Sequence, residues 1–233
     1  MIYLTGDTHI PIDIKKLNTS NFPQQKDMTR DDYVIVLGDF GLFWHKDKTF
    51  YHWRNWLEEK PFTLLWIDGN HENHEWINRL PVSTWHGGKV HKTSDNIIHL
   101  IRGNHYEIDG LHFFAAGGAQ SYDRLMRIQG ESWWKEELWS YQEQNYAFNV
   151  LQELKDKNIK IDYILSHTCP KQLIQIMFDI DPNEDFDPTT KILDEILTYI
   201  GFDNFEQWYF GHWHQDKTYS KFQCLYNKVI PIS

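Results

Sequence analysis

Five short apolar runs recur along the chain, and each one ends in a cluster of polar residues. Apolar runs of this length, bounded by turn-forming residues, are typical of buried β-strands. The pattern therefore predicts strands over residues 2–4, 33–37, 63–67, 163–165 and 208–210.

Apolar residues between these runs recur at the spacing of an amphipathic helix. Residues 141–157, for example, place Ala147, Val150, Leu151 and Leu154 at helical intervals. Strands that alternate with helices indicate an α/β layered fold. The predicted helices span residues 48–59, 72–80, 141–157 and 188–200.

Hairpin patterns replace this alternation in the middle of the chain. Residues 97–101, 105–108 and 111–115 are consecutive strand-like segments, and Asp109-Gly110 is a strong hairpin signal between the last two. Residues 218–232 read as another hairpin. Hairpins combined with strand–helix alternation predict a sandwich of two mixed sheets flanked by helices.

The pattern gives no sign of a domain boundary. The 233 residues contain no repeat, and residues 10–28 and 179–187 read as loop insertions rather than linkers. We therefore predict a single domain over residues 1–233. A domain of this size buries roughly 70–75% of its unfolded surface, so its folding requires no disulfide or structural metal.

Composition narrows the class of protein. Hydrophobic residues make up 41% of the chain and charged residues 24%, which excludes disordered and fibrous proteins. No apolar run reaches 18 residues and no signal-peptide pattern follows Met1, so we expect no membrane association. Cys169 and Cys224 lack metal-ligand spacing and are expected to be free thiols of a cytoplasmic protein.

Charge restricts the partners. The formal net charge is −10, so the average field repels long polyanions, and we expect no binding of extended nucleic acid. A pocket with two divalent cations would still attract a small phosphate compound.

Each of the five predicted strands is followed by residue types that bind metal ions. The carboxyl ends of strands in a layered α/β fold converge on one edge, so these residues are expected to meet. Asp, Asn and His without Cys favour Mn, Fe(II), Zn or Ni over a thiolate zinc site. The clusters are Gly6-Asp7-Thr8-His9, Gly38-Asp39, Gly69-Asn70-His71-Glu72, Ser166-His167 and Gly211-His212-Trp213-His214.

This ordered set, D-x-H, G-D, G-N-H-E, a single His and G-H-x-H, resembles the calcineurin-like metallophosphoesterase superfamily. Residues 85–90, 106–110 and 117–119 further resemble a small bacterial and bacteriophage branch of it, so the similarity covers nearly the whole chain. The resemblance implies the metallo-dependent phosphatase fold, a four-layer α-β-β-α sandwich of two mixed sheets flanked by helices.

The resemblance also implies a role for each motif residue. His71 would contact the phosphate and protonate the leaving group, and Glu72 would orient the ligands. Asp39 would bridge two divalent metal ions, most simply Mn, with Fe, Zn, Ni or Mg as alternatives. One ion would be held by Asp7, His9, Asp39 and His214, and the other by Asp39, Asn70, His167 and His212.

The implied activity is hydrolysis of a small phosphoester, such as a nucleotide. A metal-bridging hydroxide would attack phosphorus in line, and we favour a phosphodiester substrate. One alternative is a phosphomonoesterase of the protein Ser/Thr phosphatase or dinucleoside polyphosphate hydrolase type. A metal-binding scaffold without activity is the other, although such a scaffold has no use for His71. The natural substrate and the oligomeric state stay open.

Candidate substrate contacts allow two interpretations each. The cluster Phe40, Phe43, Trp44, His45 and His52 either forms a stacking wall for a base or packs a core. We predict that Trp44, as the residue of the wall, contacts the substrate together with Asn70 and His71.

Two further segments carry the same kind of choice. Arg124 and Arg127 follow Gly117-Gly118 and either grip phosphate, with Arg124 as our candidate, or are solvated. The Trp-rich residues 131–139 form either a lid or a dimer face.

Arg102-Gly103-Asn104-His105 repeats G-N-H without the following Glu, and we interpret it as structural. We assign no role to the remaining histidines, His74, His86, His91, His99 and His112.

Overall fold

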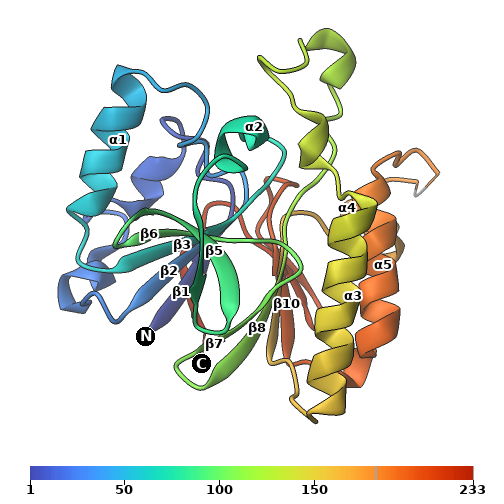
Figure 1. Ribbon diagram of the computed structural model, residues 1–233. Coiled ribbons are helices and arrows are strands. Elements are labelled where there is room, and N and C mark those ends of the chain that lie inside the picture. The colour runs from blue at the N-terminus through green and yellow to red at the C-terminus, as the bar shows by residue number, and fades with distance from the viewer. Residues whose placement is uncertain (182, 233) are drawn as a thin grey trace.

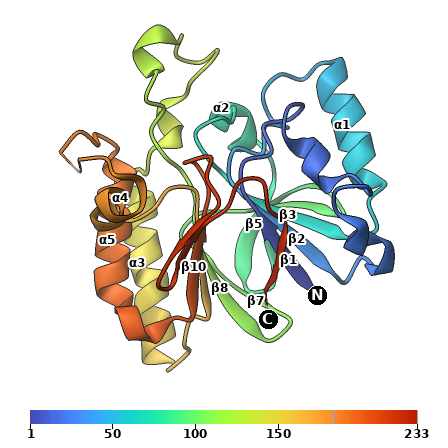
Figure 2. The same cartoon turned by 180° about the vertical axis from the view of Figure 1, so that it is seen from behind.

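The computed structural model describes residues 1–181 and 183–232. It is an α/β structure in which two mixed sheets lie face to face and helices cover their outer faces (Figures 1 and 2). Pro182, inside the predicted loop 179–187, and Ser233, at the end of the predicted domain, lie outside the described residues.

The first sheet has seven strands and a parallel centre. Strands β1, β2, β3 and β6 pair in parallel, whereas β13, β5 and β4 pair antiparallel at the two ends. Its order is β13 (Ile230–Ile232), β1 (Ile2–Thr5), β2 (Tyr33–Leu37), β3 (Thr63–Ile67), β6 (Ile97–Leu100), β5 (Gly88–Ser94) and β4 (Val82–Trp85).

The second sheet has six strands and is also mixed. Its four central strands pair in parallel, and an antiparallel strand closes each edge. Its order is β11 (Lys217–Tyr219), β12 (Phe222–Cys224), β10 (Gln207–Phe210), β9 (Tyr163–Ser166), β8 (Leu111–Ala116) and β7 (His105–Ile108).

Three apolar clusters lie between these layers. Ile35 and Leu37 face the second sheet, whereas Val34 and Val36 face outward, because side chains alternate along a strand. Helix α1 (Lys48–Glu58) contributes Phe50 to the outer cluster of the first sheet. Helices α3 (Tyr141–Asp156), α4 (Lys171–Phe178) and α5 (Pro188–Ile200) cover the outer face of the second sheet.

The five predicted strands and three of the four predicted helices are confirmed. Side-chain caps start the long helices: Asp47 caps α1, Asp187 caps α5, and Ser140 with Glu143 forms a capping box on α3. The hairpin at Asp109-Gly110 is also confirmed, and both turn residues have positive φ.

Helix α2 (His74–Ile77) is much shorter than the prediction over residues 72–80. Glu72 lies in the preceding turn because its carboxylate accepts the backbone N–H groups of Phe40 and Gly69. Asn73 then caps the helix, and Pro81 follows soon after its end. The pattern also missed α4 and the hairpin of β4 and β5.

Two terminal predictions need correction. The hairpin expected over residues 218–232 ends at Cys224, and β13 instead pairs with β1 of the other sheet. Residues 10–28, expected as a plain loop insertion, contain two 3-10 helices, of which the first buries Ile14 and Leu17. Apolar contacts with distant strands decide both outcomes.

Cys169 and Cys224 are free, as expected, and both are buried. Among the described residues, no helix combines the length and the apolar character needed to cross a bilayer.

Two histidine pairs lie outside the strand ends that carry the motifs. His91 Nδ1 is 3.1 Å from His99 Nδ1, and His105 Nε2 is 2.9 Å from His112 Nδ1. Burial, together with the neighbouring ring, lowers the pKa of His91 to about 4. The pKa of His105 is lowered to about 4 for the same reasons.

These pairs predict acid lability. In the unfolded chain a histidine binds its proton near pH 6.5, so between about pH 6.5 and 4 the unfolded state holds more protons. Stability is therefore fully present above pH 6.5 and is lost as the pH falls toward 4. Urea unfolding at pH 7 and 5 should show a smaller loss in His91→Gln/His105→Gln than in wild type. An identical loss in both proteins would contradict this assignment.

Candidate metal centre

The motif residues meet where the parallel strands of both sheets end. Asp7 and His9 follow β1, Asp39 follows β2, and His212 and His214 follow β10. All five have positive φ, between 33° and 69°, although none is glycine. Left-handed backbone at non-glycine residues is sparsely populated and clusters at functional sites, which supports a functional role for this edge.

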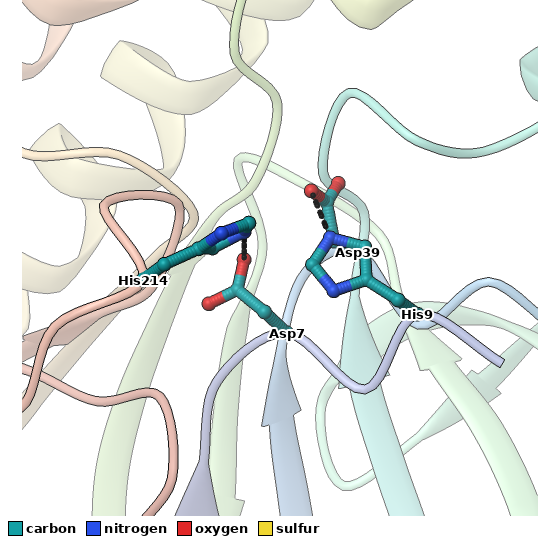
Figure 3. A group of neighbouring side chains, drawn as sticks. All are labelled: Asp7, His9, Asp39 and His214. Carbon is teal, nitrogen blue, oxygen red and sulfur yellow. Dashed lines mark hydrogen bonds and ion pairs between the residues drawn. The ribbon is translucent and has the colours of Figure 1, made fainter. Parts of the chain in front are cut away.

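Four of these side chains converge on one point. The ligand atoms of Asp7, His9, Asp39 and His214 all lie within 4.8 Å of one another (Figure 3). His9 Nε2 is 3.2 Å from Asp39 Oδ2, and His214 Nε2 is 3.9 Å from Asp7 Oδ1. Two carboxylates and two imidazoles without a thiolate are a donor set that suits borderline divalent ions such as Mn, Fe(II) or Zn.

Asp39 is held rigidly at the centre of the predicted site. Its Oδ1 accepts the backbone N–H groups of Asn70 and His71, at 2.9 and 2.8 Å. His167 Nε2 lies 3.2 Å from the same oxygen, and His9 faces the other oxygen. The Asp39 carboxylate thus lies beside an imidazole of each predicted ligand set, His9 and His167.

The predicted second set is brought together in part. His167 Nε2 lies 3.1 Å from Asn70 Oδ1, so both atoms face Asp39. The ring of His212 lies 5.0 Å from the ring of His167, and its backbone N–H donates to Asp7. His212 is not part of the four-residue group, although it lies at its border.

Contacts to the Nδ1 atoms fix the orientation of two imidazole rings, those of His9 and His167. His9 Nδ1 lies 2.8 Å from Asp13 Oδ2, and His167 Nδ1 lies 2.7 Å from the carbonyl of Leu37. Both contacts turn Nδ1 outward and Nε2 toward Asp39. Burial lowers the pKa of both rings, but the Asp39 carboxylate outweighs it and raises the pKa of His9 to about 9 and that of His167 to about 10, so each Nε2 carries a proton when no metal ion is bound. An imidazole held in this way would bind a metal ion through Nε2 after loss of that proton.

Burial and neighbouring charges both change the pKa values of the two aspartates at this edge. Burial raises the pKa of Asp7 to about 7, with the neighbouring Asp39 carboxylate adding to the effect. Burial also raises the pKa of Asp39, but His167 and His9 outweigh it and hold that pKa well below its ordinary value. Two buried carboxylates that repel each other favour a cation between them.

Two glycines leave the room that the ligands occupy. A Cβ at Gly38, which has a φ of 83°, would clash with the ring of His167. At Gly69 a Cβ would clash with the carboxylate and backbone nitrogen of Asp39. The glycines in the motif are therefore required by close approach of the ligand side chains.

His71 and Glu72 both lie beside the predicted ligands. The ring of His71 is half-buried and lies 5.6 Å from the ring of His9. Glu72 is fully buried, and its two oxygens accept N–H groups of Phe40 and Gly69 on either side of the predicted ligands. Burial raises the pKa of Glu72 to about 8.

The aromatic cluster divides between core and site. Phe40 and Phe43 are core residues, packed against Trp66, whereas His45 and His52 are exposed. Only Trp44 of this cluster lies near the site, with its ring 6.2 Å from His71 and 5.3 Å from Trp134. A stacking wall of several residues is therefore wrong, and Trp44 alone stays a candidate.

The two candidate arginines differ in position. Arg124 Nη1 donates to Gln120 Oε1 at 2.8 Å and makes no hydrogen bond to a motif residue in the described part of the chain. Arg127 Nη1 instead lies 3.2 Å from His71 Nδ1. The structure thus brings Arg127, rather than our candidate Arg124, to the site.

The second G-N-H sequence is structural, as predicted. Arg102 is buried and forms an ion pair with Asp68, and its guanidinium also reaches the carbonyl oxygens of Glu136 and Glu137. Asn104 bonds to the backbone of Ile101 and Arg102.

Sequence reasoning missed three residues that support the site. Asp13 orients His9, and its only signal is a carboxylate four residues after a candidate ligand. The Lys16 ammonium donates to the carbonyl oxygens of Gly6, Asp7 and Tyr226, which ties the first motif to the chain after β12. The Tyr226 ring stacks on His214 at 4.6 Å. No local pattern marks these contacts.

Removal of the Asp13 carboxylate tests its supporting role. Asp13→Ala should weaken binding of Mn²⁺ to the metal-free protein by about 10- to 100-fold, because the His9 ring loses its fixed orientation. Titration calorimetry would measure the affinity, with the exposed Asp203→Ala as control. Equal affinities in the two variants would show that Asp13 does not support the site.

Comparison with known proteins adds no relative. No family model matches the chain, and no curated protein is similar to it in sequence. Membership of the calcineurin-like superfamily therefore stays a prediction from the motif residues.

Proposed function

We propose that this protein is a dinuclear-metal phosphoesterase with the metallo-dependent phosphatase fold of the calcineurin-like superfamily. The observation that carries the proposal is the convergence of Asp7, His9, Asp39 and His214 at one edge of the two sheets. The free, buried Cys169 and Cys224 support a reducing compartment, and we place the activity in the cytoplasm.

The contacts support the ligand sets that the resemblance implies. Asp7, His9 and His214 would hold one ion, and Asn70, His167 and His212 would hold the second, with Asp39 shared. Mn²⁺ is the first ion to test, and Fe, Zn, Ni and Mg are alternatives. When bound, two such ions polarise a phosphoryl group and supply a nucleophile at neutral pH.

Backbone and side-chain groups of the protein fix the geometry of the site and supply its proton donor. The N–H groups of Asn70 and His71 fix the Asp39 carboxylate, so its geometry does not depend on a ligand. His71 lies beside the cluster and can donate a proton to the leaving oxygen. Trp44, next to His71, offers an aromatic surface to a base or aryl group of the substrate.

The first substrate class to test is a small phosphodiester. Phosphomonoester hydrolysis is a second candidate, favoured by the guanidinium of Arg127 beside His71, because arginine forks suit a dianionic phosphate. The test is Mn²⁺-dependent hydrolysis of a bis-aryl phosphodiester and of the matching monoester. Turnover of either that disappears with a chelator and returns with Mn²⁺ supports the proposal. Metal binding without turnover of a range of esters would favour a scaffold.

The role of His71 predicts a dependence on the leaving group. His71→Asn should reduce kcat for an alkyl ester by about 100-fold or more and for an aryl ester far less, because a good leaving group needs little protonation. Steady-state rates on an alkyl and an aryl diester would be compared in wild type and variant. Equal losses on both esters would exclude His71 as the proton donor.

A further inference from the structure

Residues 120–138, which we call the arm, project from the body of the protein near α2, beyond the ends of the strands (Figures 1 and 2). The arm follows β8 and precedes α3, and it contains only short 3-10 turns. Its tip is exposed, with Leu125 94% and Met126 86% accessible. Tight internal packing therefore does not explain how the arm keeps its position.

Two contacts fasten the base of the arm to the candidate site. Ser121 Oγ donates to the fully buried Glu137 at 2.8 Å and lies 3.4 Å from Asn70 Nδ2, so it links the arm to a predicted ligand. Trp134, only 3% exposed, packs edge to face against Trp44. The arm is thus anchored on both sides of His71.

From this anchored arm, Arg127 reaches inward. Its Nε forms an ion pair with Asp123 at 2.7 Å, and its Nη1 donates to the carbonyl of Ser132 at 3.1 Å. The same Nη1 lies 3.2 Å from His71 Nδ1. The side chain is only 18% exposed. Among the described residues, Nη2 has no hydrogen-bond partner.

We propose that Arg127 is a substrate-binding residue and that, together with His71, it takes an oxygen of the phosphoryl group. Because a guanidinium has no acceptor atom, Arg127 Nη1 donates to His71 Nδ1, and the neutral ring carries its own proton on Nε2. Among the described residues, no carboxylate accepts from Arg127 Nη2. An anion would supply the missing acceptor for Arg127 Nη2, while Asp123 stays the partner of Nε. This inference rests on the proposed function, whose reacting group it binds.

The test measures binding of inorganic phosphate to the Mn²⁺-loaded protein by titration calorimetry. Arg127→Gln should weaken phosphate binding by about 10- to 100-fold, the loss typical of a hydrogen bond to a charged group. Its affinity for Mn²⁺ should stay within about twofold of wild type. Arg127→Lys should recover part of the phosphate affinity, and Arg79→Gln, an exposed arginine on the segment after α2, controls for the loss of charge.

Two results would overturn the role of Arg127. Phosphate binding that is equal in Arg127→Gln and Arg79→Gln would show that the guanidinium does not contact the anion. Parallel loss of Mn²⁺ and phosphate affinity in Arg127→Gln would show that Arg127 only maintains the structure of the site. A wild type that binds phosphate through Arg127 yet hydrolyses no ester would leave this inference standing and count against the proposed function.

Discussion

Asp39→Asn should abolish Mn²⁺-dependent turnover, with a loss on the order of a thousandfold or more in kcat/KM. The carboxylate lies beside an imidazole of each predicted ligand set, and a neutral amide cannot offset the repulsion between two cations. Several kcal/mol of charge stabilisation correspond to such a factor. Steady-state hydrolysis and Mn²⁺ titration of the metal-free protein would both report it.

His214→Asn is the matched comparison for this variant. His214 belongs to one predicted set only, and half of its side chain is exposed, so its loss should weaken one ion and cost less activity. Thermal unfolding of the metal-free variants would establish that both fold. An Asp39→Asn protein as active as His214→Asn would refute the bridging role of Asp39.

Arg102→Met should destabilise the fold by about 3–5 kcal/mol without acting on the metal ligands themselves. The substitution leaves the buried carboxylate of Asp68 without its guanidinium. Burial raises the pKa of Asp68, but Arg102 and His99 outweigh it and hold that pKa well below its usual range. The charge therefore persists at neutral pH and is costly to leave unpaired. Urea unfolding at pH 7 measures the change.

The exposed ion pair of Arg79 with Glu75 is the control for this prediction. Its removal in Arg79→Met should change stability by at most about 1 kcal/mol, since water screens exposed pairs. The double variant Asp68→Asn/Arg102→Met should be more stable than Arg102→Met alone, because no bare charge remains. If the two arginine variants lose the same small free energy, the buried pair has no special role.

Local patterns predicted the elements that lie entirely within one stretch of sequence. The strand at residues 33–37 and the capped helix at residues 188–200 need only a run of apolar residues, a periodicity and a capping residue. Helix α4 and the strands β4 and β5 escaped prediction. Val82, Ser83 and Thr84 of β4 are exposed, so no buried face marks this edge strand in the sequence.

For the site, too, the sequence predicted one part and only the structure showed the other. The strand ends predicted that the five motif clusters would meet, because parallel strands end at a common edge. The resemblance implied the set Asp7, His9, Asp39 and His214, whose ligand atoms converge. The choice of Arg127 over Arg124 could not be read from the sequence. Both follow the same glycines, and only the fold of the arm decides which one reaches His71.

The sequence by itself therefore determined the layered α/β class, the principal strands, and the residue types gathered at their ends. Tertiary structure alone decided the pairing of β13 with β1, the burial of Phe40 and Phe43, and the support of His9 by Asp13. The physical reason is the separation along the chain over which each kind of interaction acts. Periodicity, caps and turns act over a few neighbours, whereas these outcomes depend on how surfaces far apart in the chain pack together.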